Sequence, residues 1–282
     1  MKFLDIKTDF AFKKVFGSAD SKDLLISFLN SVIEFDNHQT ITDLAIVDPY
    51  SIPLLKGMKD TFVDVKAELS DKTRVIIEMQ VLNHEGLEKR ILYNAAKNYS
   101  IQLKKGDAYH LLNPVIALTI TDFTLFKNCD ELINRFKLLE KKRFIQYSDD
   151  IELVFIELPK FNKTEPELTS IQDKWLYFIK NAGSLDYIPK NLNQELEKAF
   201  NIANEANLSE EELDLQHKKR DWIYIQKSSI EFATKTGLQQ GEWKEKMKII
   251  ENADRIGLPM QTIMALTGLD EEKIRSLLPK KS

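Results

Sequence analysis

The fold of this chain is decided between residues 59 and 80, which read KDTFVDVKAEL, then SDK at 70–72, then TRVIIEMQ. Apolar and polar residues alternate on both sides of the polar SDK segment, from Val63 to Ala67 and from Val75 to Met79. Alternation with a period of two around a polar turn is typical of a β-hairpin. We therefore predict two paired strands, each with one apolar face toward a core and one face that carries the charges.

The length of the turn fixes the register of this hairpin. A three-residue loop at 70–72 sets Leu69 opposite Thr73 and places Asp64 directly opposite Glu78. The same register pairs Glu68 with Arg74, Lys66 with Ile76 and Phe62 with Gln80.

Asp64 and Glu78 are the first candidate site residues. Opposed carboxylates in a sheet lie about 5 Å apart, and they repel each other unless one binds a proton or a cation bridges them. Oxygen ligands suit a hard divalent cation such as Mg²⁺. Gln80, one step beyond Glu78 on the same face, is placed to orient a water or a phosphate oxygen. The alternative is an ordinary solvated polar face of a hairpin.

Composition bounds the class of protein. The chain has 282 residues, with 43% hydrophobic and 30% charged side chains, which is ordinary for a soluble globular protein. The net charge of −4 means that any contact with DNA must come from a local basic patch. Cys129 is the only cysteine, which excludes an internal disulfide. Charges interrupt every N-terminal apolar run, and no run approaches the roughly 20 residues that span a bilayer, so we expect a cytoplasmic protein without a membrane partner.

The order of the predicted elements indicates an α/β fold. We predict helices within 5–33 and at 87–105, strands at 42–47, 114–121 and 151–158 beside the hairpin, and then helices at 168–181, 191–205, 210–234, 238–256, 260–266 and 271–278. This pattern predicts a mixed sheet flanked by helices, followed by a mostly helical C-terminal region. We divide the chain into 1–165, a helical region at 166–235 that packs on or next to it, and a small helical tail at 236–282. The tail resembles a helix-turn-helix unit, and we interpret it as a packing or oligomerisation unit.

The predicted helix at 87–105 carries candidate DNA contacts. Arg90, Lys97 and Lys104 recur every seven residues and would lie close to one line along it. Such a row of cations beside a pair of acids suits a phosphodiester backbone. The alternative is a solvated helix face, with the apolar stripe formed by Leu92, Ala95, Ala96, Tyr99 and Leu103.

Several common catalytic signatures are absent from the sequence. It contains no glycine-rich dinucleotide or phosphate loop and no Gly-x-Ser-x-Gly elbow. Its four histidines are scattered, and none lies at metal-ligand spacing. The dehydrogenase, kinase, α/β-hydrolase and zinc-protease classes therefore lose their main support.

Taken together, short motifs in a fixed order resemble those of a known family. The motifs are TDFAFKKVFG (8–17), FVDVKA (62–67), IEMQ (77–80), Arg90 with Tyr93, QL (102–103) with Gly106 and Tyr109, NPV (113–115), and TGL (267–269). The chain resembles the recombination-promoting nucleases, a transposase family within the PD-(D/E)XK nuclease superfamily. The resemblance covers essentially the whole chain and is densest through residues 8–120.

This resemblance implies a restriction-endonuclease-like core and an Mg²⁺-dependent DNA endonuclease linked to recombination or mobile elements, with Mn²⁺ as an alternative metal. Asp64 and Glu78 would be metal ligands, and Asp9 would complete the acidic site or serve only as an acid at a helix N-terminus. Gln80 stands where the superfamily motif usually has a lysine, which leaves the rate and the metal dependence open.

Two rival functions and one assembly follow from the same residues. The first rival is a catalytically inactive DNA- or protein-binding module with the same fold. The second is a structural or regulatory protein that acts through its helical second half. If the chain cuts both strands of a duplex with one site per copy, a homodimer is favoured.

Overall fold

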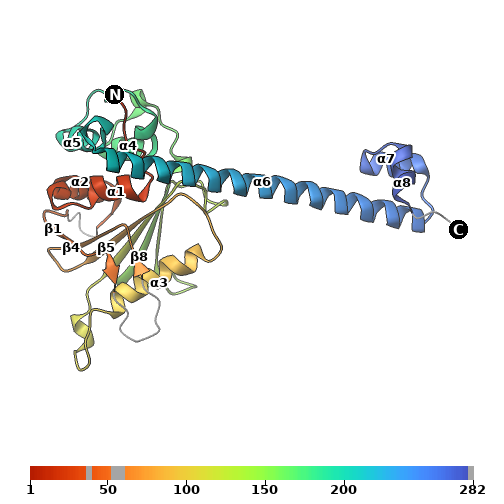
Figure 1. The fold of residues 1–282 in the computed structure, drawn as a ribbon. Helices are drawn as coiled ribbons and strands as arrows, with labels where there is room; N and C mark the ends of the chain where they lie inside the picture. Colours follow the sequence, from red (N-terminus) through yellow and green to blue (C-terminus); the bar gives the residue numbers. More distant parts are fainter. Residues whose placement is uncertain (36–39, 52–60, 279–282) are drawn as a thin grey trace. The chain divides into compact units, whose positions relative to one another are not determined.

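The computed structural model describes residues 1–35, 40–51 and 61–278 (Figure 1). Contacts within the chain divide it into two compact units, Met1–Ile223 and Tyr224–Ser282. The three-part division expected from the sequence, with boundaries after residues 165 and 235, stays a prediction.

A six-stranded sheet forms the centre of the first unit, in the order β1-β4-β5-β6-β8-β7. Its strands are β1 (Leu44–Val47), β4 (Val65–Leu69), β5 (Arg74–Gln80), β6 (Val115–Thr121), β7 (Ile133–Leu139) and β8 (Gln146–Glu157). Strands β5, β6 and β8 are parallel, and the remaining pairings are antiparallel. A separate ladder joins β2 (Tyr50–Ser51) to β3 (Thr61–Phe62). The predicted mixed sheet of an α/β fold is confirmed.

Helices cover both faces of this sheet (Figure 1). One face packs on α1 (Asp9–Phe16), α2 (Lys22–Val32), α4 (Ile171–Asn181) and α5 (Gln194–Ala203), and the other packs on α3 (Leu87–Ser100). The alternation in the hairpin explains this arrangement. Val65 and Ile77 join the main core with Trp175, whereas Ile76 packs with Ala95 of α3. The charged face of the hairpin is therefore covered by a helix and is not the solvated face that the alternative assumed.

The predicted register of the hairpin is confirmed for most of its length. Glu68 pairs with Arg74 and Lys66 with Ile76, while Leu69 N donates to Thr73 O at 2.9 Å. The predicted pair of Phe62 with Gln80 is wrong, because β4 begins only at Val65 and Phe62 pairs with Tyr50 in the small ladder. The backbone before Val65 thus leaves β5 and turns to a different partner.

The helix predicted at 87–105 is shorter than expected, and it buries a different face. It ends at Ser100, and its buried face comprises Leu87, Ile91, Asn94, Ala95, Lys97 and Asn98. Leu92, which we placed in the apolar stripe, is 53% exposed. Polar side chains in the buried face misled the hydrophobic pattern, because the sheet face beneath them carries Arg74 and Glu78, which bond to Asn98 and Asn94, among its apolar residues.

The C-terminal elements differ from the prediction in one respect. The segments 210–234 and 238–256 form one helix, α6 (Glu210–Arg255), since Gly237 and Gly241 cost only about 1 kcal/mol each within a long helix. Helices α7 (Met260–Thr267) and α8 (Glu271–Leu277) flank Gly268, whose φ of +67° makes the predicted glycine turn. Within the described ranges, no helix combines the length and the apolarity needed to cross a membrane.

Candidate active site

Asp64 lies where strand β4 separates from β5. The last backbone pair of the ladder is Val65 with Ile77, and Asp64 N donates to Ile77 O at 3.0 Å. One step further along β5, Met79 N donates to Asp64 Oδ2 at 2.8 Å. A side-chain carboxylate thus takes the place of a backbone carbonyl at the end of the ladder. This hydrogen bond fixes the carboxylate of Asp64 beside Glu78.

Three side chains donate hydrogen bonds to the carboxylate of Glu78. It is 6% exposed, and its Oε1 accepts a hydrogen bond from Asn94 Nδ2 at 2.5 Å. Its Oε2 accepts from Gln80 Nε2 at 3.0 Å and from Arg90 at 3.3 Å. Arg90 and Asn94 are one helical turn apart on α3, so both reach the same point of the sheet. The covering helix therefore orients this acid.

The pKa of each acid is raised, and burial is the main cause. Burial raises the pKa of Asp64, although the Met79 N–H and Lys13 oppose the rise, and the negative charge of Asp9 adds to it. Burial also raises the pKa of Glu78, opposed by Asn94 and Arg90 and reinforced by Asp64. The cations nearest to the pair are only partly engaged: Lys13 Nζ is 3.5 Å from Asp64 Oδ1, and its side chain is 45% exposed. The pair therefore favours an added proton or cation.

Asp9 lies near this pair but is held by other groups. Its Oδ2 forms an ion pair with Lys219 Nζ at 3.1 Å, and its Oδ1 accepts from Phe10 N. In the ranges that the structure describes, no three His, Cys, Asp or Glu residues are grouped so that they could hold a metal ion. The role of Asp9 as a third ligand stays a prediction.

The donor set around the pair suits a hard cation nonetheless. Asp64 and Glu78 supply two carboxylates, and Gln80 supplies an amide on the same strand end. Asn94 is 2% exposed, and within the described part of the chain its Oδ1 is buried without a hydrogen-bond partner. Carboxylate and amide oxygens are the ligands that Mg²⁺ and Mn²⁺ accept. The residues present therefore fit a divalent metal ion.

The three predicted DNA-binding cations do not form a row. Arg90 contacts Glu78, Lys97 is 3% exposed in the buried face of α3, and Lys104 lies beyond the end of the helix in an exposed turn. The structure brings only Arg90 to the acid pair. Binding of DNA by Lys97 and Lys104 stays a prediction. The two lysines do not share the exposed helix face that their spacing suggested.

Sequence reasoning missed two residues of this site, Lys13 and Asn94. Lys13 lies four residues after Asp9, and Asn94 lies four residues after Arg90, so each shares a helix face with a residue that we did single out. That spacing could have identified both residues. Their contacts with Asp64 and Glu78 could not be predicted, because these contacts depend on how the helices pack against the sheet.

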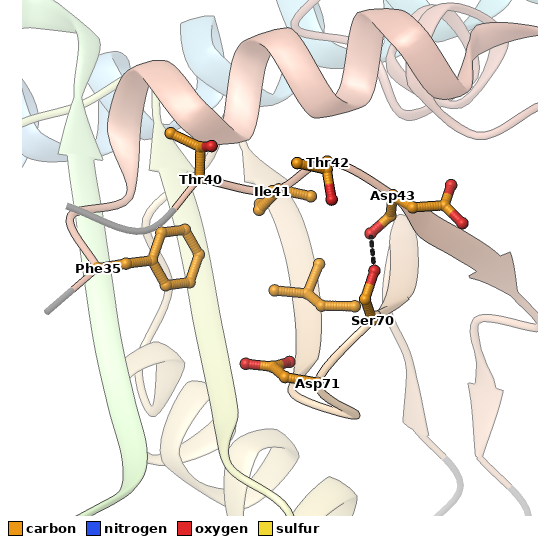
Figure 2. A pocket seen from close by; sticks show the side chains of 8 residues that line it. Phe35, Thr40, Ile41, Thr42, Asp43, Ser70 and Asp71 are labelled. Atoms are coloured by element: carbon orange, nitrogen blue, oxygen red, sulfur yellow. Dashed lines mark hydrogen bonds between the residues drawn. The ribbon is translucent and has the colours of Figure 1, made fainter. Parts of the chain in front are cut away.

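A cavity of about 190 Å³ lies elsewhere on the same hairpin (Figure 2). It is bordered by the β4–β5 turn and by the segment before β1, where Ser70 Oγ donates to Asp43 O at 3.1 Å. Phe35 and Ile41 form its apolar side. Neither Asp64 nor Glu78 lines this cavity, so it is separate from the candidate active site.

Comparison with known proteins agrees with the earlier resemblance. A family model described as PD-(D/E)XK nuclease family transposase matches residues 6–233, which include both acids, α1 and α3. No curated protein and no solved structure gives a significant match. Nucleases of the PD-(D/E)XK type typically use divalent metals, and the observed sheet with its flanking helices is consistent with their fold. The chain belongs to the PD-(D/E)XK nuclease family of transposases.

Proposed function

We propose that this protein is a metal-dependent DNA endonuclease that hydrolyses phosphodiester bonds. Membership of the family suggests a nuclease linked to mobile elements, with DNA as its partner. The observation that carries the proposal is the pair Asp64 and Glu78, a partly buried and a buried carboxylate, both of raised pKa, held side by side by fixed donors. Such a pair is costly unless a cation joins it, and a cation is what this chemistry uses.

In this proposal the acids hold Mg²⁺, with Mn²⁺ as an alternative, and Gln80 and Asn94 offer amide oxygens beside them. When bound, a divalent cation polarises a phosphoryl oxygen and lowers the pKa of water. Asn94 and Arg90 keep Glu78 oriented and ionised, because both donate to its carboxylate. The Met79 N–H does the same for Asp64. Each acid is thus positioned before the substrate arrives.

Lys13 supplies the mobile cation in this proposal. Gln80 is neutral, so it cannot offset the charge that grows on the phosphate, and Arg90 is committed to Glu78. Lys13 approaches Asp64 from α1 with nearly half of its side chain exposed. Once another cation neutralises Asp64, the Lys13 ammonium is free to swing onto a phosphate oxygen. Stabilisation of developing charge by such a group is a large term in phosphoryl transfer.

The test is cleavage of supercoiled plasmid by the purified full chain with Mg²⁺, with Mn²⁺ and with a chelator. We expect nicking that needs the metal and that Asp64→Ala and Glu78→Ala each reduce by at least about 100-fold, because loss of even an outer partner of a metal ligand costs 10- to 100-fold. Asp214→Ala is the matched control, since this exposed acid pairs only with Lys218 on α6 among the described residues. Cutting that survives both substitutions would refute the assignment of the site.

A catalytically inactive binding module with the same fold is the second candidate. The neutral Gln80 favours it, because the motif then lacks a fixed cation at that position. In this case folded wild-type protein would bind duplex DNA in a gel-shift assay but would not cut it with either metal at neutral or alkaline pH. Binding would then survive Asp64→Ala, whereas the endonuclease proposal would be abandoned.

A further inference from the structure

The loop between β7 and β8 carries an unusual combination of side chains. All ten consecutive residues from Leu138 to Tyr147 are exposed, and their sequence reads LLEKKRFIQY. We call this segment the β7–β8 arm. It belongs to the edge of the six-stranded sheet, since β7 pairs only with β8. None of the site residues described above lies in it.

The arm is held in a defined shape by Glu140. The carboxylate Oε2 of this residue accepts hydrogen bonds from Lys142 N at 3.0 Å and from Arg143 N at 2.6 Å. Glu140 N donates to Ile145 O at 2.8 Å, and Phe144 N donates to Glu140 O at 2.9 Å. The only acid of the arm is therefore used to build its turn. The cations that follow are presented on a structured loop.

Positive charge is concentrated at the tip of the arm. Lys141, Lys142 and Arg143 are consecutive and exposed, and none of them forms an ion pair with any residue that the structure describes. They stand out in a chain whose net charge is −4. Three adjacent cations that form no ion pairs favour a polyanionic partner, and a phosphate backbone presents charges at similar spacing.

Large apolar side chains accompany these cations. Phe144 is 72% exposed and Tyr147 is 84% exposed. Phe144 also has a φ of +55°, a left-handed conformation that is unfavourable for a bulky side chain. Strain of this kind persists where the surrounding structure imposes it, and it clusters at functional sites. Aromatic rings beside cations on an exposed loop are typical of nucleic-acid contacts, in which bases stack on the rings.

We propose that the β7–β8 arm is a second DNA-binding surface, which grips the duplex at a distance from the acid pair. Lys141, Lys142 and Arg143 contact phosphates, and Phe144 packs against a sugar or an unstacked base. This inference rests on the proposed function for its partner, but it uses residues that the cleavage chemistry does not touch.

The sheet register gives the distance between the two surfaces. Glu78 of β5 is level with Thr119 of β6 and with Phe155 of β8. The arm joins β8 at Gln146, nine residues before Phe155, which corresponds to about 30 Å along the strand. A duplex covers that length in about nine base pairs at 3.4 Å each. The arm therefore contributes only to DNA long enough to reach it.

The test measures binding to a 30-base-pair duplex and to a hairpin with a stem of only about 6 base pairs, too short to span about 30 Å at 3.4 Å per base pair, by fluorescence anisotropy in chelator across a range of salt concentrations. We compare wild type with the triple variant Lys141→Ser/Lys142→Ser/Arg143→Ser. The matched control is Lys72→Ser/Lys198→Ser/Lys218→Ser, which removes the same charge from exposed lysines that each pair with a carboxylate. For the long duplex, we expect the arm variant to lower the salt dependence of log K by about 2.7, which is the loss of three phosphate contacts. The control variant and the short hairpin should change much less.

Two further readouts separate the arm from the cleavage site. Phe144→Gly should weaken binding to the long duplex several-fold without lowering the melting temperature, because glycine relieves the positive φ. The arm variant should cut saturating DNA at the wild-type rate. An unchanged salt slope, or an equal change in the control variant, would overturn the role of the arm even if wild type cuts DNA. Wild type that neither binds nor cuts DNA would overturn the proposed function as well, and loss of binding only to phosphatidylserine vesicles would assign the arm to a lipid surface instead.

Discussion

Two buried carboxylates in the same sheet are treated in opposite ways. Glu157, the last residue of β8, is fully buried and accepts hydrogen bonds from Leu125 N at 2.6 Å and Phe126 N at 3.0 Å. Its Oε2 also accepts from Asn134 and pairs with Lys160 Nζ at 2.5 Å. Glu78 lies two strands away in β5, with Arg90 as its cation and Asp64 as a second acid beside it.

The difference lies in how closely the neighbouring cations are held. Glu157 has a full positive charge and three dipoles around a single negative charge, which is how a buried acid becomes part of the structure. Asp64 and Glu78 each have one cation, but at a longer distance and more exposed: Lys13 at 3.5 Å from Asp64 and Arg90 at 3.3 Å from Glu78. Acids whose pKa stays raised by burial because their cations are distant and partly exposed are better candidates for function than an acid with a close, nearly buried cation.

The largest expected effect on stability comes from neutralising Glu157, and the same change at Glu78 is the comparison. We expect Glu157→Gln to lower the free energy of unfolding by about 3 kcal/mol, because Lys160 would be left nearly buried without a counter-charge. Glu78→Gln should change it by less than about 1 kcal/mol, because it removes a charge whose burial is already unfavourable. Urea unfolding of both variants in chelator measures the two values.

Cleavage should show the reverse order. Glu157→Gln should keep the wild-type rate in its folded fraction, since Glu157 touches none of the site residues, whereas Glu78→Gln should lose it. If Glu157→Gln and Glu78→Gln lowered the free energy of unfolding equally, the proposed difference between the two acids would be refuted.

Much of the fold followed from sequence, whereas this contrast between acids did not. Period-two alternation placed Asp64 near Glu78 because parity is a local property of two strands. Glu157 stood in an equally convincing strand pattern, and nothing local showed that Lys160 and the loop at Leu125 would neutralise it. Strand β7 was missed because its apolar residues, at 133, 136, 138 and 139, do not alternate regularly with polar ones. The buried face of α3 was misjudged because Asn94 belongs to it. Contacts between distant segments decided each of these cases.

The next largest effect is expected from replacing Lys13, the cation beside Asp64. We expect Lys13→Met to slow cleavage by about 100-fold, as loss of a group that stabilises developing charge does. The same change should tighten binding of Mn²⁺ severalfold, because a cation that competes for Asp64 is removed. Thermal shift against Mn²⁺ concentration measures the affinity independently of activity.

Lys14→Met is the matched control for this substitution. Lys14 neighbours Lys13 on α1 but pairs with Glu212, away from the acids. It should leave both the rate and the Mn²⁺ affinity near wild type. Weaker metal binding in Lys13→Met would mean that this lysine only supports the local structure, and its contact with phosphate would be rejected.

The smallest effect is a pH dependence that follows from the raised pKa of both acids. In the folded state these groups bind protons at pH values where the unfolded chain, with ordinary pKa values of 3.8 for Asp and 4.5 for Glu, has already lost them. The free energy of unfolding that the pair contributes therefore rises as pH falls through the raised pKa toward these values, and it is lower at neutral pH. Cleavage needs both acids ionised, so it should fall over the same interval. Melting temperatures in chelator between about pH 4 and pH 7, with the values for Asp64→Asn/Glu78→Gln subtracted, isolate this contribution. Because a divalent cation binds the ionised pair, saturating Mn²⁺ should reverse the slope. A difference that is flat in chelator would show that Lys13 and Arg90 already offset the burial of the two acids, so that their pKa values are not raised.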